Sequence, residues 1–339
     1  MKKIYLTVDV ECHDIVNRNQ YIDGLSAKGL FGIKKILDLS KELNIPINFF
    51  FNIVENRKYG NKYTIEIINL IKQYRHNIYL HLHPEFITGD KKRSFLWEYS
   101  YEEKMQILQA GIDDYKTFLG EIPKMFRVGR YGADTEMYTV LRNMGLEMID
   151  LSYCCERPKM CHISEQDLGV YNVPIMYMNQ LIFPNTRYIA LKIRRWKKFI
   201  NLDTSDTTFN EWKRFLMKSK LSQLTLTMHS WNFIKRYFYL KKFTGADTFA
   251  EKKFKKMIIF AKEQEFEFCD LSQNPPKCSI NNDEVVDLCI GIKAKLLMLY
   301  NNYLRIKILG RQNIKYFRLY IIINSVIITS IYLLYRLIL

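Results

Sequence analysis

Two periods of apolar and polar residues alternate along the first half of the chain. Short apolar runs at residues 3–10, 46–53 and 77–80 predict β-strands. Between them, residues 25–43 and 64–74 carry apolar side chains at helical spacing. Strands that alternate with helices pack as parallel strands with helical crossovers, so the pattern predicts an α/β fold.

The same alternation continues through the second half. It predicts helices at 101–119, 135–144, 209–218 and 248–264, and strands at 125–128, 147–151, 221–228 and 266–271. Ser100 and Glu103 have the spacing of a capping box, and Asp134 is placed to cap the helix that follows it. Residues 153–184 show no sustained period and predict irregular structure with short strands. No internal repeat is visible.

The C-terminal part differs in composition from the rest. From Gly291 to the end there is no Asp or Glu, and seven Lys and Arg residues lie between positions 293 and 318. Residues 319–335 then carry no charge, and a helix of this length spans about 26 Å. That length suits a thin bilayer, although Asn and Ser side chains interrupt the run.

We therefore expect three parts. These are a globular domain at 1–275, a basic linker at 276–318 and a candidate transmembrane tail at 319–336. A buried or interfacial helix is the alternative for the tail. Positive charge beside a transmembrane end tends to stay in the cytoplasm, which predicts a tail-anchored protein at the cytoplasmic face of the membrane.

Composition narrows the class of protein. A chain of 339 residues that is 48% hydrophobic and 25% charged is typical of a globular protein. Its seven cysteines form no disulfide framework and suit a reducing compartment. Acidic Asp9 and Glu11 interrupt any secretory signal. The net charge of +16 indicates an anionic partner, but no nucleic-acid motif appears, so nucleic acid is not expected.

Polar residues that could carry chemistry stand at the ends of predicted strands. They are Asp9 and Glu11, His81 and His83, Arg127 and Arg130, Asp150, and His229. Open α/β folds collect their chemistry at the carboxyl ends of parallel strands, so these side chains should meet at one edge. Carboxylate and imidazole together suit Zn²⁺ or a similar divalent ion. A further carboxylate could act as general base, and a further histidine as general acid.

The order of these motifs along the chain resembles that in a known protein family. It runs through Thr7-Val8-Asp9-Val10-Glu11, His81-Leu82-His83-Pro84, Phe126-Arg127-Val128-Gly129-Arg130-Tyr131-Gly132, Ile149-Asp150-Leu151-Ser152 and Leu226-Thr227-Met228-His229. The sequence resembles the polysaccharide deacetylases of the NodB-homology type (carbohydrate esterase family four) over roughly residues 3–272. The resemblance implies a distorted (β/α) barrel with seven or eight strands. It also implies metal-dependent removal of N- or O-acetyl groups from glycans.

The resemblance assigns a metal site and a base. Asp9 matches the catalytic base, Glu11 a metal ligand and His81 the first metal histidine. In the family a second histidine usually follows four residues after the first, but that position is Glu85 here, while His83 lies two residues on. Either could be the third ligand, and we favour His83. The expected ion is zinc.

The remaining roles complete the expected site. Arg127 matches the arginine that orients the base, and Asp150 the acid that pairs with this arginine. His229 matches the general acid, and the backbone N–H near Tyr131 the oxyanion donor. Each also has a purely structural explanation, such as an ion pair between Arg127 and Asp150 or a buried histidine at position 229.

Two functions follow from these features. The first is a hydrolase of amide bonds that deacetylates a sugar or a lipid-linked glycan intermediate of surface polysaccharide synthesis. The second is a non-catalytic membrane-surface protein with a degenerate deacetylase fold that binds an anionic glycolipid or partner. The basic and aromatic stretches 192–198, 235–242 and 252–256 favour the second. Measuring the metal content of the purified protein would distinguish the two functions.

Overall fold

The fold is described from a computed structural model of the chain. It describes residues 2–12, 19–134, 136–146, 148–149, 171–172, 177–181, 197–205, 207–219, 223–237, 242–274, 286–287, 300 and 314–338. Asp150, the acid expected to pair with Arg127, lies outside the described residues.

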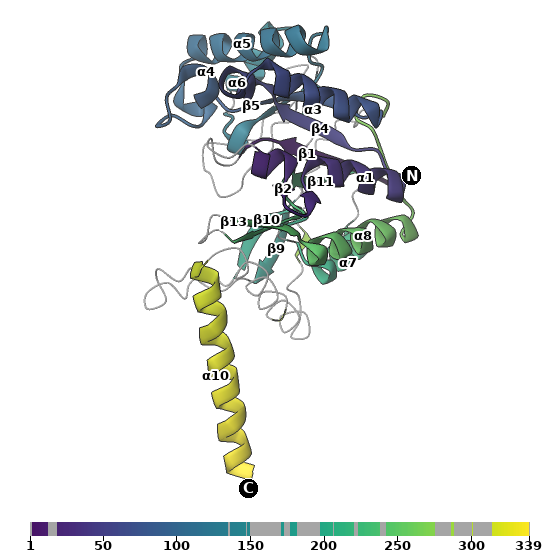
Figure 1. Ribbon diagram of the computed structural model, residues 1–339, viewed down its shortest axis with the longest axis vertical. Helices are drawn as coiled ribbons and strands as arrows, with labels where there is room; N and C mark the ends of the chain where they lie inside the picture. Colours follow the sequence, from purple (N-terminus) through teal and green to yellow (C-terminus); the bar gives the residue numbers. More distant parts are fainter. Residues whose placement is uncertain are drawn as a thin grey trace.

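A six-stranded parallel sheet organises the domain (Figure 1). Its strands are β1 (Lys2–Val10), β4 (Asn48–Asn52), β5 (Asn77–Leu82), β6 (Phe126–Val128), β11 (Gln223–His229) and β14 (Phe266–Phe268). Five of them follow the order β11-β1-β4-β5-β6. The predicted α/β class with parallel strands is thus confirmed.

Strand β1 pairs with three other strands of the sheet. Its residues from Lys3 to Asp9 pair with β11, and Thr7 to Val10 pair with β4. The short strand β14 pairs with Lys2 to Ile4 on the edge that β4 leaves uncovered. Because every pairing is parallel, the carboxyl ends of β1, β4, β5, β6 and β11 all point to one side.

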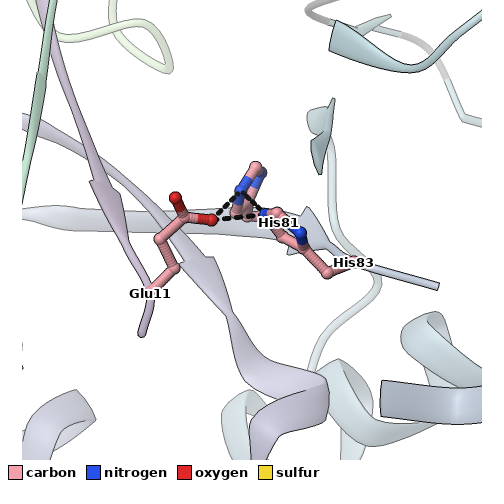
Figure 2. A group of neighbouring side chains, drawn as sticks. All are labelled: Glu11, His81 and His83. Carbon is pink, nitrogen blue, oxygen red and sulfur yellow. Dashed lines mark hydrogen bonds and ion pairs between the residues drawn. The ribbon is translucent and has the colours of Figure 1, made fainter. Parts of the chain in front are cut away.

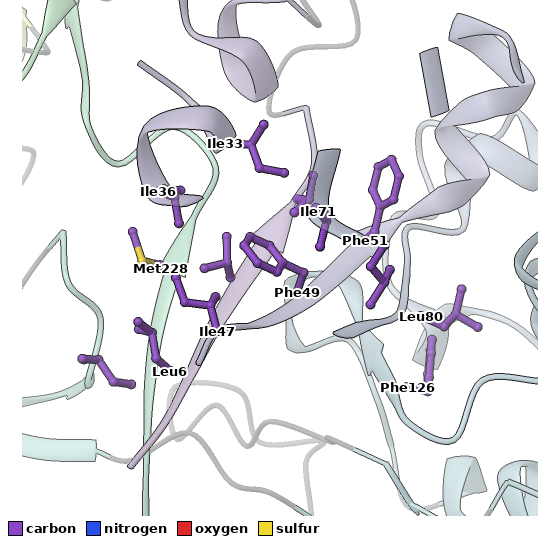
Figure 3. Close-up of a cluster of buried hydrophobic side chains, with 14 of the residues drawn as sticks. Leu6, Ile33, Ile36, Ile47, Phe49, Phe51, Ile71, Leu80, Phe126 and Met228 are labelled. Carbon is purple, nitrogen blue, oxygen red and sulfur yellow. The ribbon is translucent and has the colours of Figure 1, made fainter. Parts of the chain in front are cut away.

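Helices cover one face of this sheet. They are α1 (Ile33–Leu43), α3 (Asn61–Gln73), α5 (Tyr101–Leu119), α6 (Glu136–Asn143), α7 (Phe209–Lys218) and α8 (Thr248–Glu263). Their apolar sides pack on Leu6, Phe49, Phe51, Leu80 and other fully buried side chains of the strands (Figure 3). Each such side chain contributes about 1.5–3 kcal/mol when it leaves water.

The opposite face of the sheet has a different composition. Successive side chains of a strand point to opposite faces, so Tyr5, Phe50 and Tyr79 lie away from the helices in a smaller apolar cluster. The buried polar residues Asp9 and His81 lie an even number of positions further along the same strands, so they share this face near the carboxyl ends. The alternation of the strands therefore aims the candidate chemistry away from the helix-packed core.

Most local predictions are confirmed to within a few residues. The helix predicted at 101–119 is α5, and its capping box is present. The N–H of Glu103 donates to Ser100 Oγ, and the N–H of Ser100 donates to Glu103 Oε2. This exchange satisfies two donors at the helix start.

The helix predicted at 25–43 is wrong in its first part. Residues Leu25–Ser26 (β2) and Gly29–Leu30 (β3) form a small hairpin, and the helix α1 begins only at Ile33. Gly29 has a φ of +123°, which a helix cannot accommodate and which favours glycine. The apolar side chains of this hairpin, Leu25 and Leu30, are exposed, so the buried helical face begins only with Ile33.

Smaller elements surround the main sheet. They are α2 (Asn56–Tyr59), α4 (Glu85–Thr88), β7 (Met148–Ile149), β8 (Tyr171–Asn172), β9 (Tyr177–Leu181), β10 (Lys197–Asn201), β12 (Ile234–Tyr237), β13 (Lys242–Ala246) and β15 (Val286–Asp287). Of these, α2 follows β4 and α4 follows β5, so both stand at the carboxyl edge of the sheet.

The C-terminal helix α10 (Ile314–Ile338) extends away from the sheet in Figure 1. Many of its apolar side chains are exposed, among them Ile322, Ile328 and Ile331. Within the described residues, no helix combines the length and the apolarity that crossing a bilayer requires. The structure thus gives no support to the predicted transmembrane tail, whose uncharged run is interrupted by polar side chains such as Asn324.

Candidate metal centre and proton-transfer groups

Three of the predicted side chains meet at the carboxyl edge of the sheet. Glu11 follows β1, His81 lies in β5, and His83 comes directly after β5. One ligand atom of each can be chosen so that all three atoms lie within 4.8 Å of one another (Figure 2). His81 and His83 share a face because they are two residues apart in an extended segment.

The atoms of this group are in direct contact. Glu11 Oε2 lies 2.9 Å from His81 Nε2 and also contacts His83 Nε2. The two Nε2 atoms are 3.2 Å apart. All three residues are buried, so the carboxylate has little water to stabilise its charge.

The shifts in the pKa values of Glu11 and His83 indicate that the Glu11 carboxylate attracts positive charge. Burial alone raises the pKa of Glu11, but its contacts with His83 and His81 hold that pKa well below the usual value. Burial lowers the pKa of His83, yet the neighbouring Glu11 charge outweighs it and raises this pKa to about 9. A proton on His83 or a divalent cation would each satisfy the carboxylate.

Outer contacts orient both histidine rings. His81 Nδ1 lies 2.9 Å from the carbonyl oxygen of Arg127, so an N–H there donates to the carbonyl and leaves Nε2 with its lone pair. His83 Nδ1 lies 3.7 Å from Glu85 Oε1. A histidine whose second nitrogen faces a carbonyl or carboxylate is the usual arrangement around protein metal sites.

The position of Glu85 bears on the choice of the third ligand. Glu85 is not among the three converging residues but lies behind His83, where its Oε1 accepts from Arg130 Nη2 at 2.6 Å. Burial raises the pKa of Glu85, whereas its contacts with His83 and Arg130 lower it to about 2. The geometry thus groups His83, rather than Glu85, with Glu11 and His81.

The turn after β6 also touches this group. In residues Gly129–Tyr131, a Cβ on Gly129 would lie 2.7 Å from the His83 ring, so only glycine fits there. Arg130 has a φ of 53°, a conformation uncommon outside glycine. The close approach of Gly129 helps to fix the His83 ring, and Tyr131, whose N–H was the expected oxyanion donor, follows in the same turn.

Asp9 and Arg127 form a buried ion pair beside the metal group. Arg127 Nη1 donates to Asp9 Oδ1 at 2.5 Å, and Nη2 donates to Thr7 Oγ1 at 3.0 Å. The guanidinium also lies over the Phe50 ring, with Cζ 4.0 Å from the ring centroid. These contacts fix the Asp9 carboxylate in one orientation against Arg127.

His229 reaches the same edge from β11. It pairs in register with Asp9, and its Nε2 lies 3.7 Å from Glu11 Oε1. Its ring stacks on Trp231 with 4.6 Å between centroids. The next residue, Ser230, donates from its N to Asp9 O and from its Oγ to Glu11 O, which joins the ends of β11 and β1.

One further carboxylate was missed by reasoning from the sequence. Asp203 Oδ2 lies 3.7 Å from His229 Nδ1, on the side of the ring away from Glu11. Asp203 follows β10 and forms an isolated parallel bridge with Thr227 of β11. A signal was present, because Asp203 follows the mainly apolar run Phe199-Ile200-Asn201-Leu202, much as Asp9 stands near the end of an apolar strand.

No known family model and no curated protein matches the chain. Among solved structures, it is similar to a putative polysaccharide deacetylase from Mycobacterium smegmatis, with a TM-score of 0.47, 15% identity and coverage of 82% of this chain and 94% of that one. It is also similar to a polysaccharide deacetylase from Bacillus cereus, with a TM-score of 0.41, 12% identity and coverage of 84% and 99%.

A third similar structure has a restored activity. It is a mutant of a CE4 family pseudoenzyme, whose wild type comes from Bacillus anthracis, and it matches with a TM-score of 0.42 and 13% identity over 80% of this chain. The chain spans 66% of that protein's length. Identities and TM-scores this low define neither a family nor an activity for this chain, so the functional argument depends on the site itself.

Proposed function

We propose that the protein is a metal-dependent hydrolase that removes an acetyl group from a sugar. One observation carries the proposal. At a single sheet edge, a buried Glu-His-His group stands beside a carboxylate held by Arg127 and beside the partly exposed His229. A metal group, a base and an acid are the parts that metal-assisted hydrolysis requires.

Glu11, His81 and His83 fit a divalent ion. One carboxylate oxygen and two imidazole nitrogens form a donor set that suits zinc, and the outer contacts of both rings match those of known zinc sites. When bound, such an ion supplies Lewis-acid activation of water and of an acyl carbonyl. The unusual spacing of the two histidines is compatible with this role because both rings reach the same point.

Asp9 is proposed as the general base. Its Oδ1 is engaged by Arg127, which leaves the carboxylate fixed in position, and its second oxygen can accept a proton from the attacking water. Because Arg127 is fully buried and also bonded to Thr7, it has little freedom to release the carboxylate. Arg127 is thus a positioning residue for this step.

His229 is proposed as the general acid. Its side chain is 25% exposed, more than those of His81 and His83, so it can reach a substrate. A proton on its imidazole would pass to the nitrogen or oxygen that leaves with the sugar. Asp203 at the Nδ1 edge and the Trp231 ring stacked on the imidazole face can hold this side chain in place.

The finer features of the proposal follow the sequence resemblance. They are a NodB-type distorted barrel with additional strands, a domain ending near residue 275 and zinc as the ion. The proposed substrate is an acetylated glycan or a lipid-linked sugar of surface polysaccharide synthesis. Work at the cytoplasmic face of the membrane is supported by the seven basic residues between 293 and 318, each of which could gain ~1 kcal/mol near anionic headgroups.

Acetate release tests the proposal. The purified full chain, loaded with one equivalent of zinc, would be incubated with a panel of N-acetylated and O-acetylated oligosaccharides. Zinc-dependent release of acetate from one member is the expected result. A chain that binds zinc but releases no acetate from any member would instead favour the non-catalytic alternative, a surface protein that binds an anionic glycolipid.

A further inference from the structure

The three residues of the metal group come from strands that are not neighbours. Glu11 follows β1, while His81 and His83 belong to β5 and its end, and β4 lies between these two strands. No residue of β4 belongs to the group. The distance between the Glu11 carboxylate and the two imidazoles therefore depends on the residues at the carboxyl end of β4, which lies between β1 and β5.

Asn52, the last residue of β4, occupies this place. It pairs in register with His81 and is fully buried. Its Oδ1 accepts from the backbone N–H of His83 at 3.2 Å, and its Nδ2 donates to Glu55 Oε1 at 2.9 Å. Both the oxygen and the nitrogen of the Asn52 amide are therefore hydrogen-bonded, and the partner of the oxygen is the backbone of His83, a residue of the metal group.

Glu55 continues the connection toward β1. It ends the turn Ile53–Glu55 that follows β4, and it is buried. The oxygen that accepts from Asn52 also accepts from the backbone N–H of Cys12 at 2.9 Å. That N–H belongs to the peptide bond joining Cys12 to Glu11, so the contact fixes the chain where the Glu11 side chain leaves it.

We propose that Asn52 and Glu55 are positioning residues that set the distance between Glu11 and His83 and thereby the affinity for a divalent ion. Glu55 fixes the orientation of the Asn52 amide. Its Oε1 accepts hydrogen bonds from both Cys12 and Asn52, so Asn52 must turn its NH₂ group toward it. The carbonyl side of Asn52 then faces the His83 N–H. This inference rests on the proposed metal site and adds to it two residues that touch no ion.

Zinc affinity is the measurement that tests it. The full-length wild type, Asn52→Ala, Asn52→Leu and Glu55→Ala would be titrated with zinc against a chromogenic chelator. Loss of a partner behind a metal ligand weakens binding 10–100-fold in typical cases, and we expect a weakening on the order of that range for each variant. Asn52→Leu keeps the side-chain volume, so it reports on the hydrogen bonds even if Asn52→Ala does not fold.

Glu55→Gln is the conservative variant. Its amide oxygen can still accept from Cys12 and Asn52, so zinc affinity should remain close to that of the wild type. Glu55→Gln binding as weakly as Glu55→Ala would show that the shared acceptor is not what matters, and would overturn the role given to Glu55.

Asn48 provides a matched control on the same strand. Like Asn52 it is fully buried and joins neighbouring segments, because its Nδ2 donates to Leu6 O and Cys269 O and its Oδ1 accepts from Leu271 N. It lies at the other end of β4, away from the metal group. Asn48→Ala should lower the melting temperature but leave zinc affinity unchanged.

The outcomes separate the two proposals. If the wild type binds zinc and the Asn52 and Glu55 variants bind it equally well, the positioning roles are overturned while the metal site stands. Equal weakening in Asn48→Ala would also overturn them, because the effect would then be one of general stability. If the wild type binds no divalent ion, the proposed function itself fails.

Discussion

Arg127 donates a 2.5 Å hydrogen bond to Asp9, and both side chains are buried at the edge of the sheet. A buried charge is costly unless it is paired, so each residue depends on the other for its stability as an ion. Removing one partner would leave the other uncompensated. Substitutions here must therefore keep the hydrogen bond if they are to report on chemistry rather than on folding.

Asp9→Asn meets this condition. The amide oxygen can still accept from Arg127, but an amide cannot take a proton from water. We expect zinc binding to be retained and turnover on an acetylated sugar to fall by ~10²-fold or more. The surface substitution Asp38→Asn, which changes contacts with Lys34 and Tyr74 far from the metal group in sequence, serves as the control and should leave turnover unchanged. Wild-type turnover in Asp9→Asn would exclude it as the base.

Metal stoichiometry tests the ligand group. His81→Ala and His83→Ala should each abolish stoichiometric zinc, measured by elemental analysis after gel filtration. Glu85→Ala should only weaken binding, because Glu85 lies behind His83. His76→Ala is the control, since His76 contacts Ser40 and lies outside the group. Full zinc in His83→Ala together with loss in Glu85→Ala would reverse their assignment.

The role of His229 can be tested with two leaving groups. A sugar amine needs a proton as it departs, whereas nitrophenolate does not. His229→Ala should therefore lose ~10²-fold or more in the rate of sugar deacetylation but much less in hydrolysis of nitrophenyl acetate. Asp203→Asn should show the same selectivity to a smaller degree, because it only contacts the ring. Equal losses on both substrates would contradict a proton-donating role.

Glu55 should make stability depend on pH in the metal-free protein. Burial raises the pKa of its carboxyl to about 8, although hydrogen bonds from Cys12 and Asn52 oppose this rise. In the unfolded chain the carboxyl ionises near its ordinary value of about 4.3. Between these two values the folded state binds more protons, so this group lowers stability as the pH rises from about 5 to about 8.

Glu55→Gln removes this dependence. Relative to the wild type, the variant should become more stable as the pH rises from about 5 to about 8. Urea unfolding with a chelator present gives the difference in free energy at each pH. A difference that stays constant over this range would show that the Glu55 carboxyl does not hold its proton in the folded protein.

The domain boundary gives another prediction. All the buried hydrophobic residues of the described structure lie at or before Leu271. A chain ending at Pro276 should therefore fold cooperatively and bind zinc as the full chain does. Only the full chain should bind vesicles that contain anionic lipid, through its basic segment and α10, and this binding should weaken with salt. Vesicle binding by the shortened chain would place the membrane contact elsewhere.

The sequence was informative about which residues meet at the sheet edge. Parallel strands bring their carboxyl ends together, so the end positions of Glu11, His81 and His229 sufficed to predict that they would approach one another. The two-residue spacing of His81 and His83 also predicted their shared face. These inferences need only the strand boundaries and the period of a strand.

Other contacts could not be foreseen in the same way. The link from Asn52 to His83 depends on the register between β4 and β5, and the contact of Asp203 with His229 depends on how the segment after β10 lies against β11. Register and loop path are set by tertiary packing, which leaves little trace in local spacing. The hairpin at Leu25–Leu30 was mistaken for helix for the same reason.

The position of β1 between β11 and β4 has a consequence for the order in which the protein can assemble. Strand β1 is made before its partners β11 and β14, which follow it by more than two hundred residues. Pairings so distant in sequence form slowly, because a long loop must close before they gain any contact. The edge of β1 beside Asp9 therefore stays unpaired until β11, which ends at His229, has been made, and the start of β1 is not fully paired until β14 follows at Phe266–Phe268. An unfinished strand edge invites association with other chains, so a nascent or shortened product that ends before Phe268 should depend on chaperones to stay soluble.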